Sequence, residues 1–301
     1  MPFRAPHMDL SFFIFFGALF VLYALATWIV LRAAPMGRSA LPLLFGFAIV
    51  FNAALLPSIP NLSDDMYRYI WDGRVQASGF NPYRYASDAP ELILLRDAEI
   101  WARMNRRGAT TIYPPGAQLV FAIGWRLVGD SILAFKILFV CASFICAALL
   151  VQLLKRLGQA PERVILFLWG PLLIFEIAHS GHVDALYLPL IVAALLVRAA
   201  SPADRVEWRY EGALGILIGL AILVKLYPAI LVPPLWALRD SQGKRRWRLA
   251  FPLTTLLVTG LGYLLYIAPG VNTLGFLARY TQEFFNIGPL PLALNHWSEG
   301  N

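Results

Sequence analysis

Long apolar segments alternate with short polar ones along almost the whole of this chain. A helix that crosses the roughly 30 Å hydrocarbon core of a bilayer needs about 20 mostly apolar residues. The expected spans are 10–31, 41–57, 131–154 and 249–268. Shorter apolar runs, which we expect to be helical as well, are 164–178, 185–197, 213–224 and 229–238. The pattern predicts an all-α, polytopic transmembrane helical bundle, with residues 1–301 as a single domain.

Composition supports the membrane assignment. The chain has 301 residues, of which 59% are hydrophobic and only 14% are charged, whereas about a quarter of the residues of a soluble domain are charged. The first apolar run is longer than the roughly 7–15 residues of a signal-peptide core. Cys141 and Cys146 lie in one apolar helix and are expected to be small core residues. We therefore predict an integral protein of a bacterial-type inner or plasma membrane.

The formal net charge of +7 comes from basic residues in short loops between apolar runs, which does not suggest nucleic-acid binding. Short loops rich in Lys and Arg stay in the cytoplasm. The loops assigned to that side are 32–40, 155–163, 198–211 and 239–248. The segments on the other side are then 58–116, 179–184, 225–228 and 269–301, with the N-terminus also outside. Every unusual polar cluster of the chain is thus predicted to face the extracytoplasmic side.

Residues 117–129 form an apolar run that is too short to cross a bilayer. We predict a helix lying in the membrane interface, with Trp125 and Arg126 at its polar edge. Helix breaks are predicted at His179–Asp184 (HSGHVD) and at Lys225–Pro228 (KLYP). Irregular backbone at membrane depth is tolerated where it is buried in protein or lines a wet cavity. These breaks are therefore expected to line a polar cavity, with the loop 58–116 folded over it.

The start of that loop reads LSDDMYRYIWDGRVQASGFNPYRY over residues 62–85. Its apolar positions have helical spacing, so one face of a helix can lie on a membrane or a core. Those positions are Met66, Tyr69, Ile70 and Gly73, and the charged Arg68, Asp72 and Arg74 face elsewhere. Ser63 or Asp64 is expected to cap the helix. The alternative is a solvated, charge-balanced loop.

Asp64 and Asp65 are the strongest candidates for chemistry. A carboxylate at the mouth of a cavity can act as a general base, because burial or a like-charged neighbour tunes its pKa. A pair of acids can instead hold a divalent cation through oxygen ligands. Solvation in an ordinary loop is the third interpretation.

The two helix breaks carry further ionisable groups. His179, His182 and Asp184 are expected to line the cavity and bind a polar ligand, since ionisable groups at membrane depth are expensive and usually functional. The alternatives are a zinc site, for which no further ligands are visible, and a buried pair that holds the turn together. Lys225 either snorkels to the interface or pairs with an anion such as phosphate.

Aromatic residues of the loop can stack on sugar rings, or they can form an interfacial belt. They are Trp71, Phe80, Tyr83, Tyr85 and Trp101. Tyr113 precedes Pro114, which favours an extended segment just before the interfacial helix, although a plain helix start is an equal alternative. We expect Trp71, Asp72, Tyr83 and Tyr113 to position the loop or the acceptor.

Four motifs together resemble the GT-C superfamily of membrane glycosyltransferases that use polyprenyl-phosphate sugars, most of all its family 87 and GPI-mannosyltransferase-like group. The motifs are SDDMYRYIWDGRVQASGFNPYRYA, TIYPPGAQLVFAIGWRLVGDS, GHVDALYLPL and GLAILVKLYPAILVPP, over about residues 55–240. The resemblance implies an acidic motif in the first large extracytoplasmic loop, followed by juxtamembrane helices. The chain departs from the family in an extra span before that loop and in lacking the family's C-terminal spans, so it is expected to be C-terminally incomplete.

The resemblance also implies roles for single residues. Asp64 or Asp65 would be the catalytic acid or base, and Lys225 and Tyr227 would lie near the lipid phosphate. Nucleotide sugars stay in the cytoplasm, so transfer on the outer face needs a lipid-linked donor. The expected reaction moves a hexose, with mannose implied by the resemblance, onto a glycan, lipid or protein acceptor with inversion.

In that reaction the carboxylate deprotonates the acceptor hydroxyl. Lys225, helped by Arg68 or Arg84, would neutralise the departing prenyl phosphate. His182 and Asp184 would contact the donor. The competing interpretation is a transporter or lipid-sugar flippase, because broken helices with ionisable residues also bind substrates in transporters. No inverted repeat is visible to support it.

Overall fold

The computed structural model describes residues 10–33, 35–37, 39–202, 207–236, 249–268, 272–277 and 279. Within these ranges every regular element is a helix, and no described residue forms a strand. The predicted all-α class is therefore confirmed. α1 (Leu10–Ala33) and α5 (Ile132–Arg156) are long and apolar enough to cross a membrane, whereas α2 (Ala40–Leu55) and α11 (Ala250–Leu264) are apolar but shorter. The polytopic arrangement stays a prediction.

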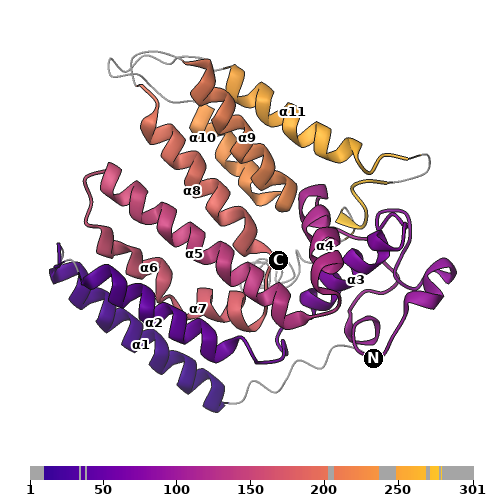
Figure 1. Ribbon diagram of the computed structural model, residues 1–301, viewed down its shortest axis with the longest axis horizontal. Coiled ribbons are helices and arrows are strands. Elements are labelled where there is room, and N and C mark those ends of the chain that lie inside the picture. Colours follow the sequence, from indigo (N-terminus) through magenta and orange to yellow (C-terminus); the bar gives the residue numbers. More distant parts are fainter. Residues whose placement is uncertain are drawn as a thin grey trace, which may run out of the picture.

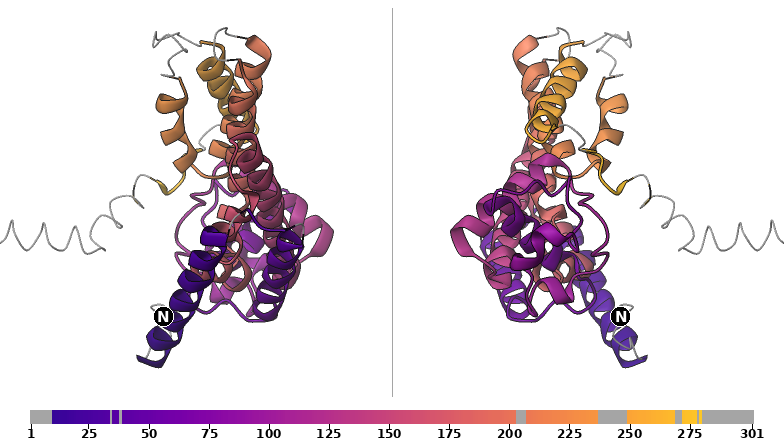
Figure 2. Two further views of the ribbon diagram at one scale, coloured as in Figure 1. Left: turned by 90° about the vertical axis from the view of Figure 1, so that its left-hand side faces the viewer. Right: turned by 90° about the vertical axis from the view of Figure 1, so that its right-hand side faces the viewer.

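The long helices are arranged as an array. Helices α5, α8 (Asp184–Ala200), α9 (Trp208–Val224) and α11 lie side by side in this order, each in contact with the next (Figure 1). At the other edge of the array, α1 and α2 pack on the short helix α6 (Ile165–Leu168). Figure 2 shows this array edge-on, as a thin layer.

The two ends of the array differ in chemistry. Helices α1, α5 and α8 carry basic residues in their last turns, namely Arg32, Lys155, Arg156 and Arg198. These turns lie at the end of the array away from α3 and α4 (Figure 1). The turn 180–183 lies at the opposite end, against the start of α3, and Lys225 bonds to Asp184 directly after this turn. The structure thus groups the segments as the charge pattern predicts, while the identity of the cytoplasmic end stays a prediction. Residues 239–248 and most of 269–301 lie outside the described residues.

Helix α3 (Asp65–Ala77) packs against α4 (Pro115–Val128) at the end of the array opposite the basic last turns. Gly73 makes the close approach possible, because a Cβ at this position would overlap the carbonyl oxygen of Phe121. One turn earlier, the ring of Tyr69 stacks on that of Phe121 with their centroids 4.6 Å apart. The apolar face predicted for α3 is therefore its packing face.

The prediction that the charged residues of α3 face elsewhere needs correction. Arg68, Asp72 and Arg74 are as buried as the apolar positions. The loop 78–114 covers them, with two short 3-10 turns, η1 (Pro90–Leu95) and η2 (Trp101–Arg103). The alternative of a solvated loop over residues 62–85 is therefore wrong.

Helix α4 confirms the helix predicted at 117–129, although not its position in a membrane interface. It starts at Pro115, since a proline has no N–H to lose in a first turn. One face is buried on α3, and the other exposes Leu119, Ile123 and Leu127 in a stripe at helical spacing.

Two apolar runs predicted as continuous helices are broken. In the run 164–178, α6 ends at Leu168, α7 (Pro171–Ile174) follows, and the π-helical turn η4 (Phe175–His179) ends it. The cause is Pro171, which forces the residue before it into an extended conformation. The run 229–238 starts as the 3-10 turn η5 (Tyr227–Leu231) and continues as α10 (Val232–Trp236), and its last two residues lie outside the described part.

Candidate active site

The first turn of α3 and the two helix breaks meet at one end of the array. Asp65 opens α3, and His182 lies in the turn between η4 and α8 with its Nε2 atom 3.9 Å from the Asp65 carboxylate. Asp184, the first residue of α8, accepts two hydrogen bonds from Lys225 Nζ, at 2.7 and 2.9 Å. Three segments that are far apart in the sequence thus place acids, an imidazole and an ammonium group together.

The imidazole of His182 is held between acidic and hydroxyl groups. Its Nδ1 atom pairs with Glu176, and its Nε2 atom lies 3.0 Å from Ser63 Oγ. Burial alone would lower the pKa of His182, but the hydrogen bond with Glu176 and the negative charges of Asp65, Glu176 and Asp184 outweigh burial and raise the pKa. The ring is therefore poised to carry positive charge next to Asp65.

The neighbouring acids Asp64 and Asp65 have different surroundings. Asp64 is 9% exposed and accepts a hydrogen bond from Asn105 Nδ2. Burial, followed by the charge of Asp65, raises the pKa of Asp64 to about 6. The Asp65 side chain is 39% exposed. Ser63 rather than Asp64 takes the capping role, since its Oγ accepts from the Asp65 amide at 3.3 Å.

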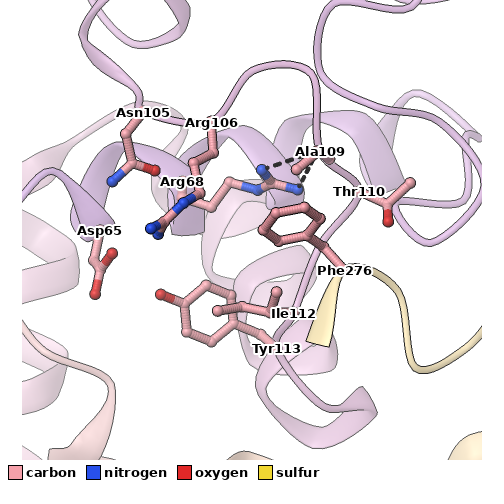
Figure 3. A pocket seen from close by; sticks show the side chains of 9 residues that line it. All are labelled: Asp65, Arg68, Asn105, Arg106, Ala109, Thr110, Ile112, Tyr113 and Phe276. Atoms are coloured by element: carbon pink, nitrogen blue, oxygen red, sulfur yellow. Dashed lines mark hydrogen bonds between the residues drawn. The ribbon is translucent and has the colours of Figure 1, made fainter. Parts of the chain in front are cut away.

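A pocket opens beside Asp65 (Figure 3). It encloses about 370 Å³, part of it open to solvent. Its lining residues are Asp65, Arg68, Asn105, Arg106, Ala109, Thr110, Ile112, Tyr113 and Phe276. In Figure 3 the hydroxyl of Tyr113 and the guanidinium of Arg106 lie on the side of the pocket where Asp65 stands. The pocket thus joins an acid, cations, hydroxyls and an aromatic ring.

Arg106 has an unusual backbone. Its φ of 43° makes it the one non-glycine residue with positive φ among the residues that the structure describes. A side chain in this left-handed region costs free energy, and such strain concentrates at functional sites. The preceding residue, Asn105, is fixed by its bond to Asp64. Both residues of this tight turn line the pocket.

The group around Lys225 lies outside that pocket. The Tyr187 hydroxyl donates to Asp184 at 2.9 Å, and the Lys225 ammonium lies 5.5 Å from the ring centre of Tyr227. Tyr227 itself is 72% exposed. Of the two interpretations of Lys225, the structure supports pairing with an anion, and the anion is Asp184.

Several residues predicted to meet the acceptor are instead buried in the loop. Trp71 and Tyr83 are 1% and 3% exposed, so neither ring is available to stack on a sugar. The Tyr83 hydroxyl donates to the Tyr113 carbonyl at 2.6 Å. Asp72 accepts from Arg68 Nε and from Gln118 Nε2, both at 2.8 Å. These contacts fit loop positioning, the other role predicted for this group.

Arg84 does not reach the site. Its side chain is exposed and lies over the Tyr85 ring, 5.6 Å from the ring centre, and it does not line the pocket. Arg68 does line the pocket, and it donates to Asp72 and to the Ala109 carbonyl. Of the two loop arginines predicted to bind phosphate, only Arg68 therefore lies beside Asp65.

His179 has a structural role rather than a place in the cavity. It is 7% exposed, and its ring nitrogens lie 2.7 Å from Ser58 Oγ and 2.9 Å from Asn61 Oδ1. Lys136 of α5 adds to this anchor by donating to the carbonyls of Leu56 and Ser58 at 2.8 and 2.7 Å. Together these bonds fix the segment that leads from α2 to Asp64.

Sequence reasoning did not single out Glu176, Asn105, Arg106, Lys136 or Phe276. Glu176 carried a usable signal, because it is the one carboxylate within the apolar run 164–178. A lysine inside the apolar run 131–154 is the same kind of signal for Lys136. The other three lie in or after loops, where nothing in the local pattern marks them.

Among the residues that the structure describes, no three His, Cys, Asp or Glu side chains lie close enough together to hold a metal ion. Asp64 and Asp65 are the adjacent pair considered for a divalent cation, and one of them is engaged by Asn105.

Comparison with known proteins gives one family. The protein-family model described as alpha-(1->6)-mannopyranosyltransferase, N-terminal domain, matches residues 3–239 of this chain. Alpha-(1->6)-mannopyranosyltransferase A of Mycobacterium tuberculosis is 27% identical over 255 residues, which cover 76% of this chain and 47% of that protein. The protein with the same name from Corynebacterium glutamicum is 26% identical over 188 residues, or 60% of this chain and 35% of that protein.

The matched regions span about half of the length of these curated relatives or less. The family match includes Asp65, His182 and Lys225 but ends before Phe276. No solved structure matches the chain.

Proposed function

This chain belongs to the alpha-(1->6)-mannopyranosyltransferase family, and we propose that it is part of a membrane enzyme that transfers mannose from a polyprenyl-phosphate donor to an acceptor hydroxyl. The observation that supports this most is the meeting of Asp65, His182 and the Asp184–Lys225 pair beside an open pocket. A base next to a cation is what displacement of a phosphate by a hydroxyl requires.

The proposed setting is a polytopic GT-C-like bundle whose active site opens on the extracytoplasmic side. Basic last turns at the far end of the array favour that orientation. The exposed stripe Leu119, Ile123 and Leu127 on α4 suits a helix that lies in the membrane interface beside the site. A lipid-linked donor would then reach the site from the bilayer.

Asp65 is the proposed base, and Asp64 is not. A general base must first reach the proton it removes, and only then does its pKa matter. Burial raises the pKa of Asp64 to about 6, but the Asp64 carboxylate is bonded to Asn105 and does not line the pocket. Asp65 lines the pocket, and the imidazole of His182, held by Glu176, lies 3.9 Å from its carboxylate.

The proposed step is one displacement at the anomeric carbon. The acceptor oxygen forms a bond to this carbon while its proton passes to Asp65. The bond from the anomeric carbon to the phosphate oxygen breaks, and its electron pair leaves with the prenyl phosphate. Inversion gives an α-linked product from a β-linked donor. The relatives' name specifies an α-(1→6) linkage, so we propose the 6-hydroxyl of a mannosyl acceptor.

Lys225 is proposed to meet the leaving phosphate. Its side chain is 31% exposed at the end of α9, and its ammonium group is held by Asp184, which keeps it in place between turnovers. Phosphate oxygens would replace part of that contact as negative charge develops on the leaving group, when a fixed cation stabilises it most. The exposed ring of Tyr227 suits the adjoining lipid chain.

The experiment compares Asp65→Asn with Asp64→Asn in the full-length protein, in membranes, with a radiolabelled polyprenyl-phosphate mannose. Asp65→Asn is expected to lower transfer about 100- to 10,000-fold, because the general base is lost. Asp64→Asn, the neighbouring control, should keep most of the activity. Full activity of Asp65→Asn at normal expression would contradict the assignment. Label that crosses the bilayer without reaching an acceptor would indicate a transporter.

A further inference from the structure

The segment after α11 lies against the loop of the candidate site. Gly275 has a φ of 56°, and a Cβ at this position would overlap the carbonyl oxygen of Thr111. Asn272 shapes the turn, since its carbonyl accepts from the Gly275 amide at 2.8 Å and its side chain accepts from the Leu274 amide at 3.1 Å. Only glycine satisfies both the backbone angle and the close approach.

This approach carries Phe276 into the pocket. Its ring stands among the lining side chains in Figure 3, near Ala109 and the guanidinium of Arg68. The guanidinium of Arg279 lies 5.8 Å from the ring centre. Phe276 is thus an aromatic wall supplied to the site by a segment that lies beyond the family match, which ends at residue 239.

The chemistry of the pocket fits a sugar ring. Thr110, Asn105 and the Tyr113 hydroxyl offer groups that bond to sugar hydroxyls, while an aromatic face packs on the apolar C–H face of a pyranose. A prenyl chain needs a longer and more apolar channel, so the lipid part of the donor does not suit this pocket.

The position of Asp65 separates two binding regions. Lys225, which is assigned to the donor phosphate, does not line the pocket, and neither do its neighbours Asp184 and Tyr227. Asp65 both lines the pocket and faces His182. A base has to lie beside the acceptor hydroxyl, from which it takes a proton. We therefore expect the acceptor to bind in the pocket that Asp65 lines.

We propose that this pocket is the acceptor-sugar subsite and that Phe276, positioned by Gly275, is the platform on which the acceptor's mannosyl ring packs. The inference rests on the proposed function and adds to it a substrate class for this pocket and a residue that determines acceptor affinity.

The test measures steady-state kinetics of the full-length enzyme with a radiolabelled polyprenyl-phosphate mannose and an alkyl α-mannoside whose 6-hydroxyl is free. Phe276→Ala is expected to raise the acceptor KM about tenfold while the donor KM and kcat change less than about threefold. Phe276→Tyr should restore the acceptor KM, because it restores the aromatic face. Gly275→Ala should raise the acceptor KM although the ring is still present.

Leu274→Ala is the matched control, since Leu274 is in the same turn and 56% exposed. It should leave both KM values unchanged. If the wild type is active and neither Phe276→Ala nor Gly275→Ala changes its acceptor KM, the inference is overturned and the proposed function stays intact. A rise in the donor KM alone would assign the pocket to the donor and overturn it as well. A wild type that transfers no mannose would instead remove the proposed function, and this inference with it.

Discussion

The first turn of helix α3 and its later turns carry similar residues and use them differently. At its start, Asp65 is 39% exposed, opens onto a pocket and faces His182. Two turns later, Asp72 is 1% exposed, and each of its carboxylate oxygens accepts a hydrogen bond, from Arg68 Nε and from Gln118 Nε2. The first acid has room to meet a substrate, and the second is fully occupied by the protein.

The difference shows how to distinguish a charged residue that can act on a substrate from one that stabilises the fold. A buried ion pair costs desolvation, and it is tolerated when the remaining hydrogen-bonding groups are satisfied. Arg74 follows the same rule, since it pairs with Asp97 and Asp130 and donates to the Leu95 carbonyl at 2.8 Å. The later turns of α3 therefore hold the loop in place, so that its first turn presents Asp65.

The largest expected effect is on stability, at the buried Arg68–Asp72 pair of α3. Asp72→Ala leaves the guanidinium of Arg68 buried without its carboxylate. Breaking a buried pair in this way typically costs about 3–5 kcal/mol of unfolding free energy. We expect a clear fall in the midpoint of thermal unfolding in detergent, with little folded protein at growth temperature.

Asp130→Ala is the matched control for that prediction. Asp130 also pairs with an arginine of α3, with Arg74 at 2.8 Å, but its side chain is 47% exposed. An exposed pair is worth about 1 kcal/mol or less. Equal losses of stability in the two variants would show that burial does not separate the two kinds of charge.

A smaller effect is expected at the Asp184–Lys225 pair, and on kinetics rather than folding. Lys225→Met removes the charge of a side chain that is 31% exposed, so the unfolding midpoint should change little. If Lys225 binds the leaving phosphate, the donor KM should rise about 10- to 100-fold, the usual worth of one hydrogen bond to a charged group.

Lys155→Met, at the exposed C-terminal end of α5, is the corresponding control at the far end of the array. Donor titrations with both variants should separate them. An unchanged donor KM in Lys225→Met would leave the Asp184–Lys225 pair as a purely structural contact, in the same class as Arg68–Asp72.

The helices were largely predictable from the sequence, because apolar runs and positive loops act locally. Where prediction failed, a single residue broke the helix predicted from an apolar run, as Pro171 does between α6 and α7. The burial of α3 on all sides was not predictable, since it depends on the loop 78–114 folding over it. Helical spacing identifies one apolar face, but it does not reveal a cover supplied from elsewhere in the chain.

The candidate site was predictable only in part. Asp65, His182, Asp184 and Lys225 stand out as ionisable groups at helix ends, and the structure brings them together. The sequence does not tell Asp64 from Asp65, because the distinction arises from Asn105, 41 residues away. Phe276 enters the pocket through one close backbone contact with Thr111. Long-range contacts of this kind leave no pattern in the local sequence.

The smallest expected effect is at Asp64, whose surroundings are intermediate between those of the pocket-lining Asp65 and the buried Asp72. This acid is buried like Asp72, but it is bonded to a neutral amide and sits next to another acid. Its pKa is about 6 in the folded state against 3.8 for the free side chain. The folded protein therefore binds the proton more tightly than the unfolded chain does, and its stability falls as the pH rises from about 4 to 6.

Asp64→Asn removes this titration, and its amide oxygen can still accept from Asn105. The variant should therefore be more stable than the wild type at pH 7.5, by on the order of 1–2 kcal/mol, and the difference should vanish below about pH 3, where Asp64 is neutral in both states. Thermal unfolding of both proteins across this pH range measures the effect. A difference that stays constant with pH would mean that Asp64 does not titrate as its burial implies, and that it belongs with Asp72 among the satisfied acids of α3.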